Sequence, residues 1–118
     1  MASDAESKGV YERPWGHYKV HGKGDNWALK TLHVSPDQAT SLQTHARRDE
    51  YWMLVSGEAI VVRDEAMLPL LPFQLFHVTK GAKHRLIGGP AGCIVVEVMQ
   101  GDYDENDITR IEDNYGRV

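Results

Sequence analysis

Side chains that could do chemistry crowd one short stretch of the chain, SLQTHARRDEYW (41–52). Residues two apart on a β-strand point the same way, so Gln43 and His45 share one face. Glu50 alternates in phase with the apolar Trp52, so it points inward if Trp52 does. An inward carboxylate is costly unless it is paired or holds a cation. The stretch therefore predicts a metal-binding site or, as the simpler alternative, a solvated turn between strands.

A second histidine that could join this site follows a glycine turn in TKGAKHRLI (79–87), where His84 begins a strand-like run. Two histidines, one carboxylate and one amide oxygen make a ligand set of the kind that binds a divalent metal. Single histidines in β proteins are more often ordinary surface or core residues, and we interpret the others in that way. The predicted ligands are Gln43, His45, Glu50 and His84, and the ordinary histidines are His17, His21, His33 and His77.

Short runs rich in β-branched and aromatic residues would position these side chains, and turn sequences with glycine, proline and aspartate separate the runs. No stretch before residue 102 keeps a helical apolar period, and the connections are too short for parallel strands. The sequence thus predicts an antiparallel all-β domain, either a barrel, a sandwich or a jelly roll. The expected strands are HYKV (17–20), WALKTLHV (27–34), EYWMLVSG (50–57), EAIVVR (58–63), QLFHVT (74–79), HRLIGG (84–89) and GCIVVEVM (92–99).

Both ends of the chain depart from this pattern. The first ten residues are mostly small and polar, and we expect a disordered tail at 1–10 before a single domain at 11–118. In the segment 102–118, Ile108 and Ile111 are three apart and a glycine near the end could cap a helix. A short helical or irregular segment is therefore expected at the C-terminus.

The overall composition narrows the class of protein. The 118 residues are 42% apolar and 25% charged, which is typical of one globular domain. A formal net charge of −4 argues against a nucleic-acid partner, and the longest apolar run, MLPLLPF (67–73), is too short to span a membrane. No secretory signal is visible at the start, and the single cysteine, Cys93, forms no internal disulfide. We expect a cytoplasmic protein.

The spacing of the candidate ligands resembles the two signature motifs of the cupin superfamily. The first motif lies in QTHARRDE (43–50) with Gly57 after it, and the second in GAKH (81–84). Gln43 stands where the first histidine of the motif usually stands. The resemblance implies an all-β cupin fold, which is a double-stranded β-helix or jelly-roll barrel.

A narrower resemblance covers nearly the whole chain, to the C-terminal cupin domain of type II mannose-6-phosphate isomerases. In that family the domain follows a guanylyltransferase domain, and here we expect it to stand alone. The resemblance implies Zn²⁺ bound by Gln43, His45, Glu50 and His84, with Fe²⁺, Mn²⁺, Co²⁺ and Ni²⁺ as alternative ions. The stretches that carry it are RPWG (13–16), LKTLHVSP (29–36), SLQTH (41–45), VSGEA (55–59) and VVEVMQGDYDENDITRIEDNYGR (95–117).

The same resemblance implies an isomerase that acts on a hexose phosphate, as small-molecule substrate, through an enediol. Cations must hold the phosphate. Lys30 alternates in phase with Leu32, and Arg117 stands in the YGR ending, so these two are the candidate catalytic residues. Glu97 is interpreted either as a partner of Lys30 or as a pocket acid, and the sequence does not choose a general base. A homodimer is expected, because exposed strand edges need cover.

Two other functions stay open on the sequence. Family members usually carry histidines where this chain has Ala46, Arg47 and Tyr51, which favours a non-catalytic metal- and sugar-binding module. Two histidines and a carboxylate also match non-haem iron oxygenases, so a cupin dioxygenase is the third interpretation. Gln43 argues against the dioxygenase, because an amide oxygen suits zinc better than iron.

Overall fold

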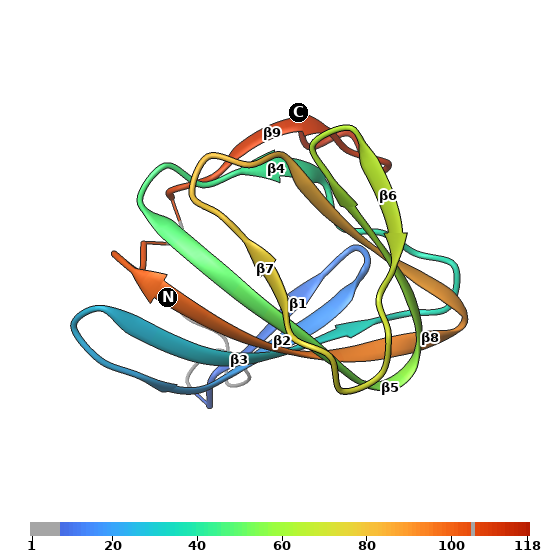
Figure 1. The fold of residues 1–118 in the computed structure, drawn as a ribbon, viewed down its shortest axis with the longest axis horizontal. Coiled ribbons are helices and arrows are strands. Elements are labelled where there is room, and N and C mark those ends of the chain that lie inside the picture. Colours follow the sequence, from blue (N-terminus) through green and yellow to red (C-terminus); the bar gives the residue numbers. More distant parts are fainter. Residues whose placement is uncertain (1–7, 105) are drawn as a thin grey trace.

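The computed structural model of the chain describes residues 8–104 and 106–118, and these form β-strands and no helix. The strands pair in antiparallel fashion and curl round a common interior (Figure 1). The predicted antiparallel all-β fold is confirmed. In chain order the strands are β1 (Val10–Arg13), β2 (Gly16–Lys23), β3 (Trp27–Val34), β4 (Leu42–Thr44), β5 (Arg48–Arg63), β6 (Ala66–Pro69), β7 (Phe76–Val78), β8 (His84–Gly101) and β9 (Thr109–Glu112).

The two long strands β5 and β8 form the spine of the fold and pair with each other along nearly their whole length. Their register shifts twice around Gly57, and irregularities of this kind bend a strand. Gly57 has a φ of 78°, and a Cβ there would lie 2.1 Å from the carbonyl oxygen of Gly92 on β8. The position therefore requires glycine, and the bend lets both strands wrap round the interior.

The remaining strands extend this spine. β3 pairs with the second half of β8, and β2 and β1 follow outward. β6 and β7 pair with opposite ends of β5. β4 pairs with the start of β8, and β9 pairs with β4, so that these two short strands lie together at one side of the molecule (Figure 1). Segments far apart in the sequence thus line one interior.

Inward positions alternate along the strands as predicted, so charged groups enter the interior together with the core. Lys30 is buried in β3 in phase with Leu32, and Glu50 is buried in β5 in phase with Trp52. The buried hydrophobic side chains pack into one cluster, which includes Trp15, Leu32, Trp52, Leu54, Val61, Leu86 and Val95.

The C-terminal segment contains a strand where a short helix was one expectation. Residues 109–112 form β9, which pairs with β4, and the residues after it are irregular. The three-residue spacing of Ile108 and Ile111 suggested a helix, but Ile111 is 39% exposed. Extended backbone instead gives β4 a hydrogen-bonding neighbour, which a helix could not do.

The N-terminal boundary also needs a correction of one residue. Val10 belongs to β1 and pairs with Lys19, and the carbonyl oxygen of Gly9 accepts a hydrogen bond from the Val20 amide. Most of the expected tail, residues 1–7, lies outside the described residues, and its disorder stays a prediction. Within residues 8–104 and 106–118, none of the secondary structure is a helix with the length and apolar character needed to cross a membrane.

Candidate metal centre

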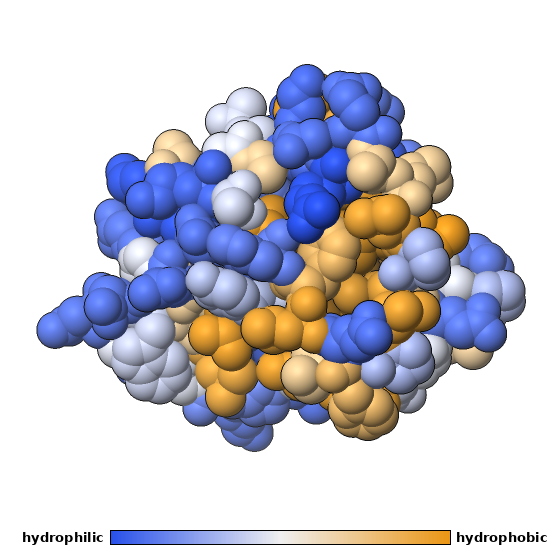
Figure 2. Space-filling view, viewed as in Figure 1, coloured by the Kyte–Doolittle hydropathy of each residue, from blue (hydrophilic) through white to orange (hydrophobic). Residues whose placement is uncertain are grey.

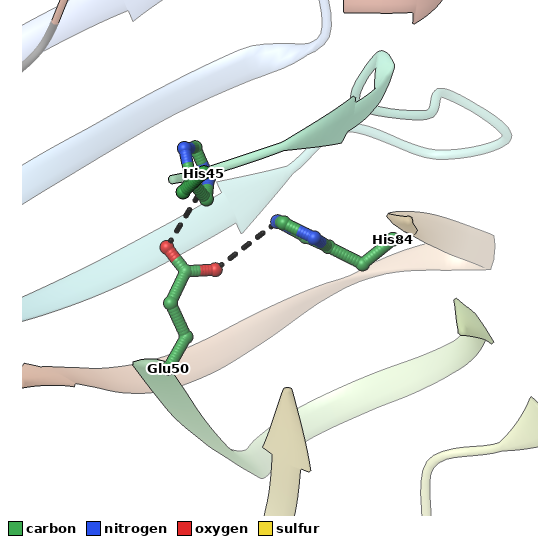
Figure 3. A group of neighbouring side chains, drawn as sticks. All are labelled: His45, Glu50 and His84. Atoms are coloured by element: carbon green, nitrogen blue, oxygen red, sulfur yellow. Dashed lines mark ion pairs between the residues drawn. The ribbon is translucent and has the colours of Figure 1, made fainter. Parts of the chain in front are cut away.

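Three of the four predicted ligands meet inside the jelly roll, each from a different part of the chain (Figure 3). His45 follows β4, Glu50 lies near the start of β5 and His84 opens β8. Glu50 lies between the two rings, with its Oε2 at 3.4 Å from His45 Nε2 and its Oε1 at 3.2 Å from His84 Nε2. One ligand atom from each residue lies within 4.8 Å of the others, and all three residues are buried.

Backbone groups fix the orientation of both imidazole rings. His45 Nδ1 donates to the carbonyl oxygen of Asp107 at 2.6 Å, and His84 Nδ1 donates to that of Ala82 at 3.0 Å. A carbonyl oxygen only accepts, so the hydrogen sits on Nδ1 in both rings and Nε2 faces Glu50. The glycine turn before His84 is tied to the first motif, because the Gly81 amide donates to the carbonyl oxygen of His45 at 2.9 Å. The tautomer with hydrogen on Nδ1, which both rings adopt, is the one in which a histidine binds a metal through Nε2.

The contact between His84 and Glu50 lacks a hydrogen-bond donor, and a cation between the two side chains would replace it. Both His84 Nε2 and Glu50 Oε1 are buried, and neither has a hydrogen-bond partner among the described residues. With the hydrogen on Nδ1, the two atoms present lone pairs to each other across 3.2 Å, which is unfavourable unless a proton or a metal ion lies between them. Imidazole nitrogen and carboxylate oxygen are ordinary ligands of divalent ions. The residues therefore fit a divalent metal.

The electrostatics of the group favour the metal-binding protonation states of His45 and Glu50, whereas His84 favours a proton. Burial lowers the pKa of His45 to about 4, because Glu50 only partly offsets it, so the ring is neutral at neutral pH. Burial alone would raise the pKa of Glu50, but His84, His45 and Arg48 outweigh it and hold the pKa below its usual range. Burial alone would lower the pKa of His84, yet the Glu50 carboxylate raises it. A metal must therefore displace a proton that His84 and Glu50 otherwise share.

A cavity of about 110 Å³ opens beside this group. Lys30 lies in it, with Nζ at 3.7 Å from Glu97 Oε2, and Glu97 also lines the cavity, so Glu97 is both the partner of Lys30 and a pocket acid. Arg117 also lines the cavity, and its guanidinium makes two 2.8 Å hydrogen bonds to the carboxylate of Asp113. The charged groups of the lining are Arg13, Lys30, Arg48, Arg110, Arg117, Glu50 and Glu97.

Gln43, the fourth predicted ligand, lies next to the group. It is the cross-strand neighbour of His84 and lines the same cavity. Its Oε1 accepts a hydrogen bond from Ser41 Oγ at 3.0 Å. Its part in metal binding stays a prediction.

The sequence matches proteins of one family over most of its length. Residues 2–113 match the family described as mannose-6-phosphate isomerase C-terminal. The chain belongs to this family. Two relatives are the xanthan biosynthesis protein XanB of Xanthomonas campestris pv. campestris, 41% identical, and a mannose-1-phosphate guanylyltransferase of Escherichia coli K12, 36% identical. Each match covers 90% of this chain and 23% of the relative, so the chain spans about a quarter of the length of these relatives.

Solved structures agree on the fold of this family member. A cupin-2 domain from Rhodospirillum rubrum superposes with a TM-score of 0.71 at 15% sequence identity, over 96% of this chain and 74% of that one. At such low identity the likeness shows the fold alone. The predicted cupin fold is confirmed.

Arg48 and Asp107 support the metal-binding group of this mannose-6-phosphate isomerase C-terminal domain. The sequence analysis did not assign either residue to that group. Arg48 Nη2 lies 3.1 Å from both His45 Nε2 and Glu50 Oε2, so a metal on His45 requires this guanidinium to move aside. The alternation of inward and outward residues could have identified Arg48, because it lies two residues before Glu50 on β5 and points to the same side. Asp107 accepts hydrogen bonds from the amides of Ala46 and Arg47 through its carboxylate. Nothing in the local sequence links residues so far apart.

Proposed function

We propose that this cupin domain is a metal-dependent isomerase of the mannose-6-phosphate type, which interconverts an aldose and a ketose phosphate. The observation that carries the proposal is the cavity beside His45, Glu50 and His84, which combines a metal-binding group, a second buried carboxylate and several cations. The names of the relatives add support, because one of them is a guanylyltransferase of mannose 1-phosphate. A cytoplasmic setting is part of the proposal, since Cys93 is a free thiol and such thiols are usual in reducing compartments.

Zn²⁺ is the proposed ion, held by His45, Glu50 and His84, with Gln43 as the fourth ligand. When bound, such an ion supplies Lewis acidity, which polarises the sugar oxygens and stabilises the enediol charge. The ligand set alone does not separate Zn²⁺ from Fe²⁺, Mn²⁺, Co²⁺ or Ni²⁺, because imidazole and carboxylate bind all of them.

Glu97 is the proposed general base. Its Oε1 accepts a hydrogen bond from Trp52 Nε1 at 3.1 Å, while its Oε2 is buried without a hydrogen-bond partner among the described residues. Burial and the charge of Glu50 raise the pKa of Glu97, and Lys30 only partly offsets this. A carboxylate with a raised pKa is the stronger base. It would take the proton from C2 of the aldose and return it to C1 of the enediol.

Lys30 and Arg117 complete the proposed machinery from the cavity wall. Lys30 keeps the Glu97 carboxylate oriented from 3.7 Å and can donate to a sugar oxygen. Arg117 is held by Asp113 in a two-point contact that leaves its guanidinium on the lining of the cavity. Such a prepositioned guanidinium suits an anionic group of the substrate.

The test is interconversion of mannose 6-phosphate and fructose 6-phosphate by zinc-loaded protein at high enzyme concentration. Glu97→Gln should lower kcat by roughly 10²- to 10⁴-fold, the usual contribution of a general base. Glu58→Gln makes the same chemical change at an exposed position outside the cavity and should leave kcat unchanged. Wild-type protein that leaves both sugars unchanged would overturn the proposal.

A non-catalytic sugar-binding module is the second candidate, and one observation favours it. Arg48 donates to His45 Nε2, the nitrogen that would bind the metal. A protein in which this contact persists would bind its ligand without turnover. Saturable binding of mannose 6-phosphate by protein that shows no isomerisation would support this candidate.

A further inference from the structure

Three arginines line the cavity beside the metal group. Arg13 ends β1, Arg110 lies on β9 and Arg117 follows in the C-terminal segment, and all three line the cavity. In the sheet, β4 lies between β8 and β9, so that Gln43 has His84 as its neighbour on one side and Arg110 on the other. Arg110 therefore stands one strand beyond His84, and all three arginines share the lining of the cavity.

Arg110 lacks an acceptor that its position demands. Its Nε is buried and has no hydrogen-bond partner in the described part of the chain. Burial lowers the pKa of Arg110, and the charges of Arg117 and Arg13 add to this effect, while Asp113 opposes it. Leaving a charged donor unpaired among like charges is costly, so an anion at this place would be stabilising.

The other two arginines are already anchored. Arg117 is held by Asp113, and Arg13 lies over the ring of Tyr18 at 5.2 Å and donates to its hydroxyl at 3.4 Å. Five cationic side chains and two carboxylates line the cavity, and Asp113 offsets the charge of Arg117, so two positive charges remain in excess although the whole chain has a net charge of −4. A phosphate monoester carries about two negative charges near neutral pH, which matches this local excess.

We propose that Arg13, Arg110 and Arg117 form a subsite for the phosphate group of a phosphorylated sugar, with Arg110 one strand away from the metal group. The proposal rests on the proposed function only for the identity of the sugar. Arg110 supplies the unpaired guanidinium donor, and the two anchored arginines complete a three-sided cradle for the oxygens.

Binding without turnover tests this subsite. Inorganic phosphate and mannose 6-phosphate are titrated into the 118-residue chain by calorimetry, with acetate as a carboxylate probe. Arg110→Gln should raise the Kd for both phosphate compounds about 10-fold or more, the scale of one charge-assisted hydrogen bond. Arg110→Lys keeps the charge but loses the planar fork, and should recover binding only in part. Arg63→Gln removes the same charge outside the cavity and should leave both Kd values unchanged.

The outcomes separate the subsite from the reaction. Loss of binding in Arg110→Gln but not in Arg63→Gln supports the subsite, even when wild-type protein shows no isomerisation. Equal binding by wild type and Arg110→Gln overturns the subsite, even when isomerisation is observed. Acetate that binds as tightly as phosphate overturns the assignment to phosphate. Circular dichroism of each variant checks that the fold is retained.

A different observation concerns the outer surface. β6 and the segment that joins it to β7 expose four large apolar side chains: Met67 at 64%, Leu71 at 49%, Phe73 at 68% and Leu75 at 65%. Hydrophobic residues gather over this part of the molecule in Figure 2. The stretch 66–76 contains no charged residue, and Phe73 has a φ of 60°, a strained conformation for an exposed aromatic residue. We name these four residues the β6–β7 patch.

We infer that a second copy of this chain covers the β6–β7 patch. With Ile60 beside it, the patch presents on the order of 500 Å² of apolar surface, near the upper end for a monomer. Two such patches face to face reach about 1,000 Å², the lower limit of a specific interface. Each copy has a net charge of −4, so two copies approach most readily through a surface without charge. Apolar hollows of about 330 and 290 Å³ adjoin the segment. These hollows can receive the apolar side chains of the second copy.

Sedimentation equilibrium tests this second inference independently of ligand and activity. Wild-type protein should be dimeric at high micromolar concentration, and Phe73→Ser with Leu75→Ser should be monomeric with an unchanged circular dichroism spectrum. Val98→Ser removes an exposed apolar side chain on β8, away from the patch, and should leave the dimer intact. A monomeric wild type, or a dimer that survives the double substitution, would overturn it.

Discussion

The interior of the jelly roll has a polar half and an apolar half, built on the same strands by the same alternation. Along β5, inward positions change from Arg48 and Glu50 to Leu54 and Val61. The polar half consists of Lys30, Arg48, Glu50, His84 and Glu97, and the apolar half of Leu54, Val61, Leu86 and Val95, all of them buried. Burying apolar side chains stabilises the fold, whereas burying charges costs stability unless they are paired. The difference indicates that the polar half is kept for a site and the apolar half for the fold.

The largest effect we expect from separating the two halves is on metal binding. His84→Ala removes one of the proposed ligands and should weaken Zn²⁺ binding by on the order of 10²-fold or more, while far-ultraviolet circular dichroism stays unchanged. The matched control is His77→Ala. His77 pairs with Asp49 at 3.0 Å and stacks on Tyr51, away from the cavity. Metal content after dialysis measures both, and equal retention by the two variants would refute the assignment of His84.

The converse substitution lies in the apolar half. Leu86 is fully buried, and Leu86→Ala should cost about 2–5 kcal/mol of unfolding free energy through lost burial and the cavity left behind. The folded fraction should still bind Zn²⁺ as the wild type does. Ile60→Ala, at a position that is 41% exposed, should cost much less. Urea unfolding measures the free energies, and a large loss of metal affinity in folded Leu86→Ala would show that the halves are coupled.

The sequence predicted both halves of the interior through one argument. A period of two places Lys30 with Leu32 and Glu50 with Trp52, and the structure buries all four. The same alternation brings Arg48 inward, since it has the parity of Glu50 on β5. The resemblance to the two cupin motifs implied that His45 and His84 meet, and in the structure the Gly81 amide donates to the carbonyl oxygen of His45.

What the sequence did not predict depends on contacts between distant residues. The carbonyl oxygen of Asp107 orients His45, but a backbone acceptor leaves no trace in residue type. Arg110 lies across from Gln43 only because β9 pairs with β4. The spacing of Ile108 and Ile111 suggested a helix there. The segment forms a strand instead because β4 offers a free edge with which it can pair.

A smaller effect tests whether the polar half needs its charges to be paired. Lys30→Met leaves the charge of Arg48 as the remaining cationic influence on buried Glu97 among those that lower its pKa, and should cost about 1–3 kcal/mol near pH 8. The pKa of Glu97 is already raised by burial and by Glu50, and losing Lys30 raises it further. The folded protein then holds a proton that the unfolded chain releases near pH 4.3, roughly the ordinary value.

The stability deficit of Lys30→Met should therefore be small in acid and should grow as the pH rises through the folded-state pKa of Glu97. Glu97→Gln added to Lys30→Met removes the unpaired charge and should restore most of the loss. Urea unfolding at about five pH values between pH 4 and 8 gives the unfolding free energies of both variants for this comparison. A deficit that does not change with pH would mean that Lys30 stabilises the fold through packing alone.

The smallest effect concerns Cys93, a titratable group at the edge of the apolar half, where it is buried on β8. Burial raises the pKa of the Cys93 thiol to about 11, although the Val34 backbone partly offsets it. Because only the thiolate is nucleophilic, iodoacetamide should label folded protein at pH 8 far more slowly than urea-unfolded protein.

The folded state keeps a proton that the unfolded thiol loses near pH 8.5, an approximate ordinary value. The contribution of Cys93 to stability is therefore fully present below that pH and is lost as the pH rises toward 11. Cys93→Ala should remove this alkaline dependence while changing the unfolding free energy at pH 7 only slightly. Rapid labelling of folded protein at pH 8 would show that this edge of the apolar half opens to solvent, and that the boundary between the halves is less sharp than burial alone indicates.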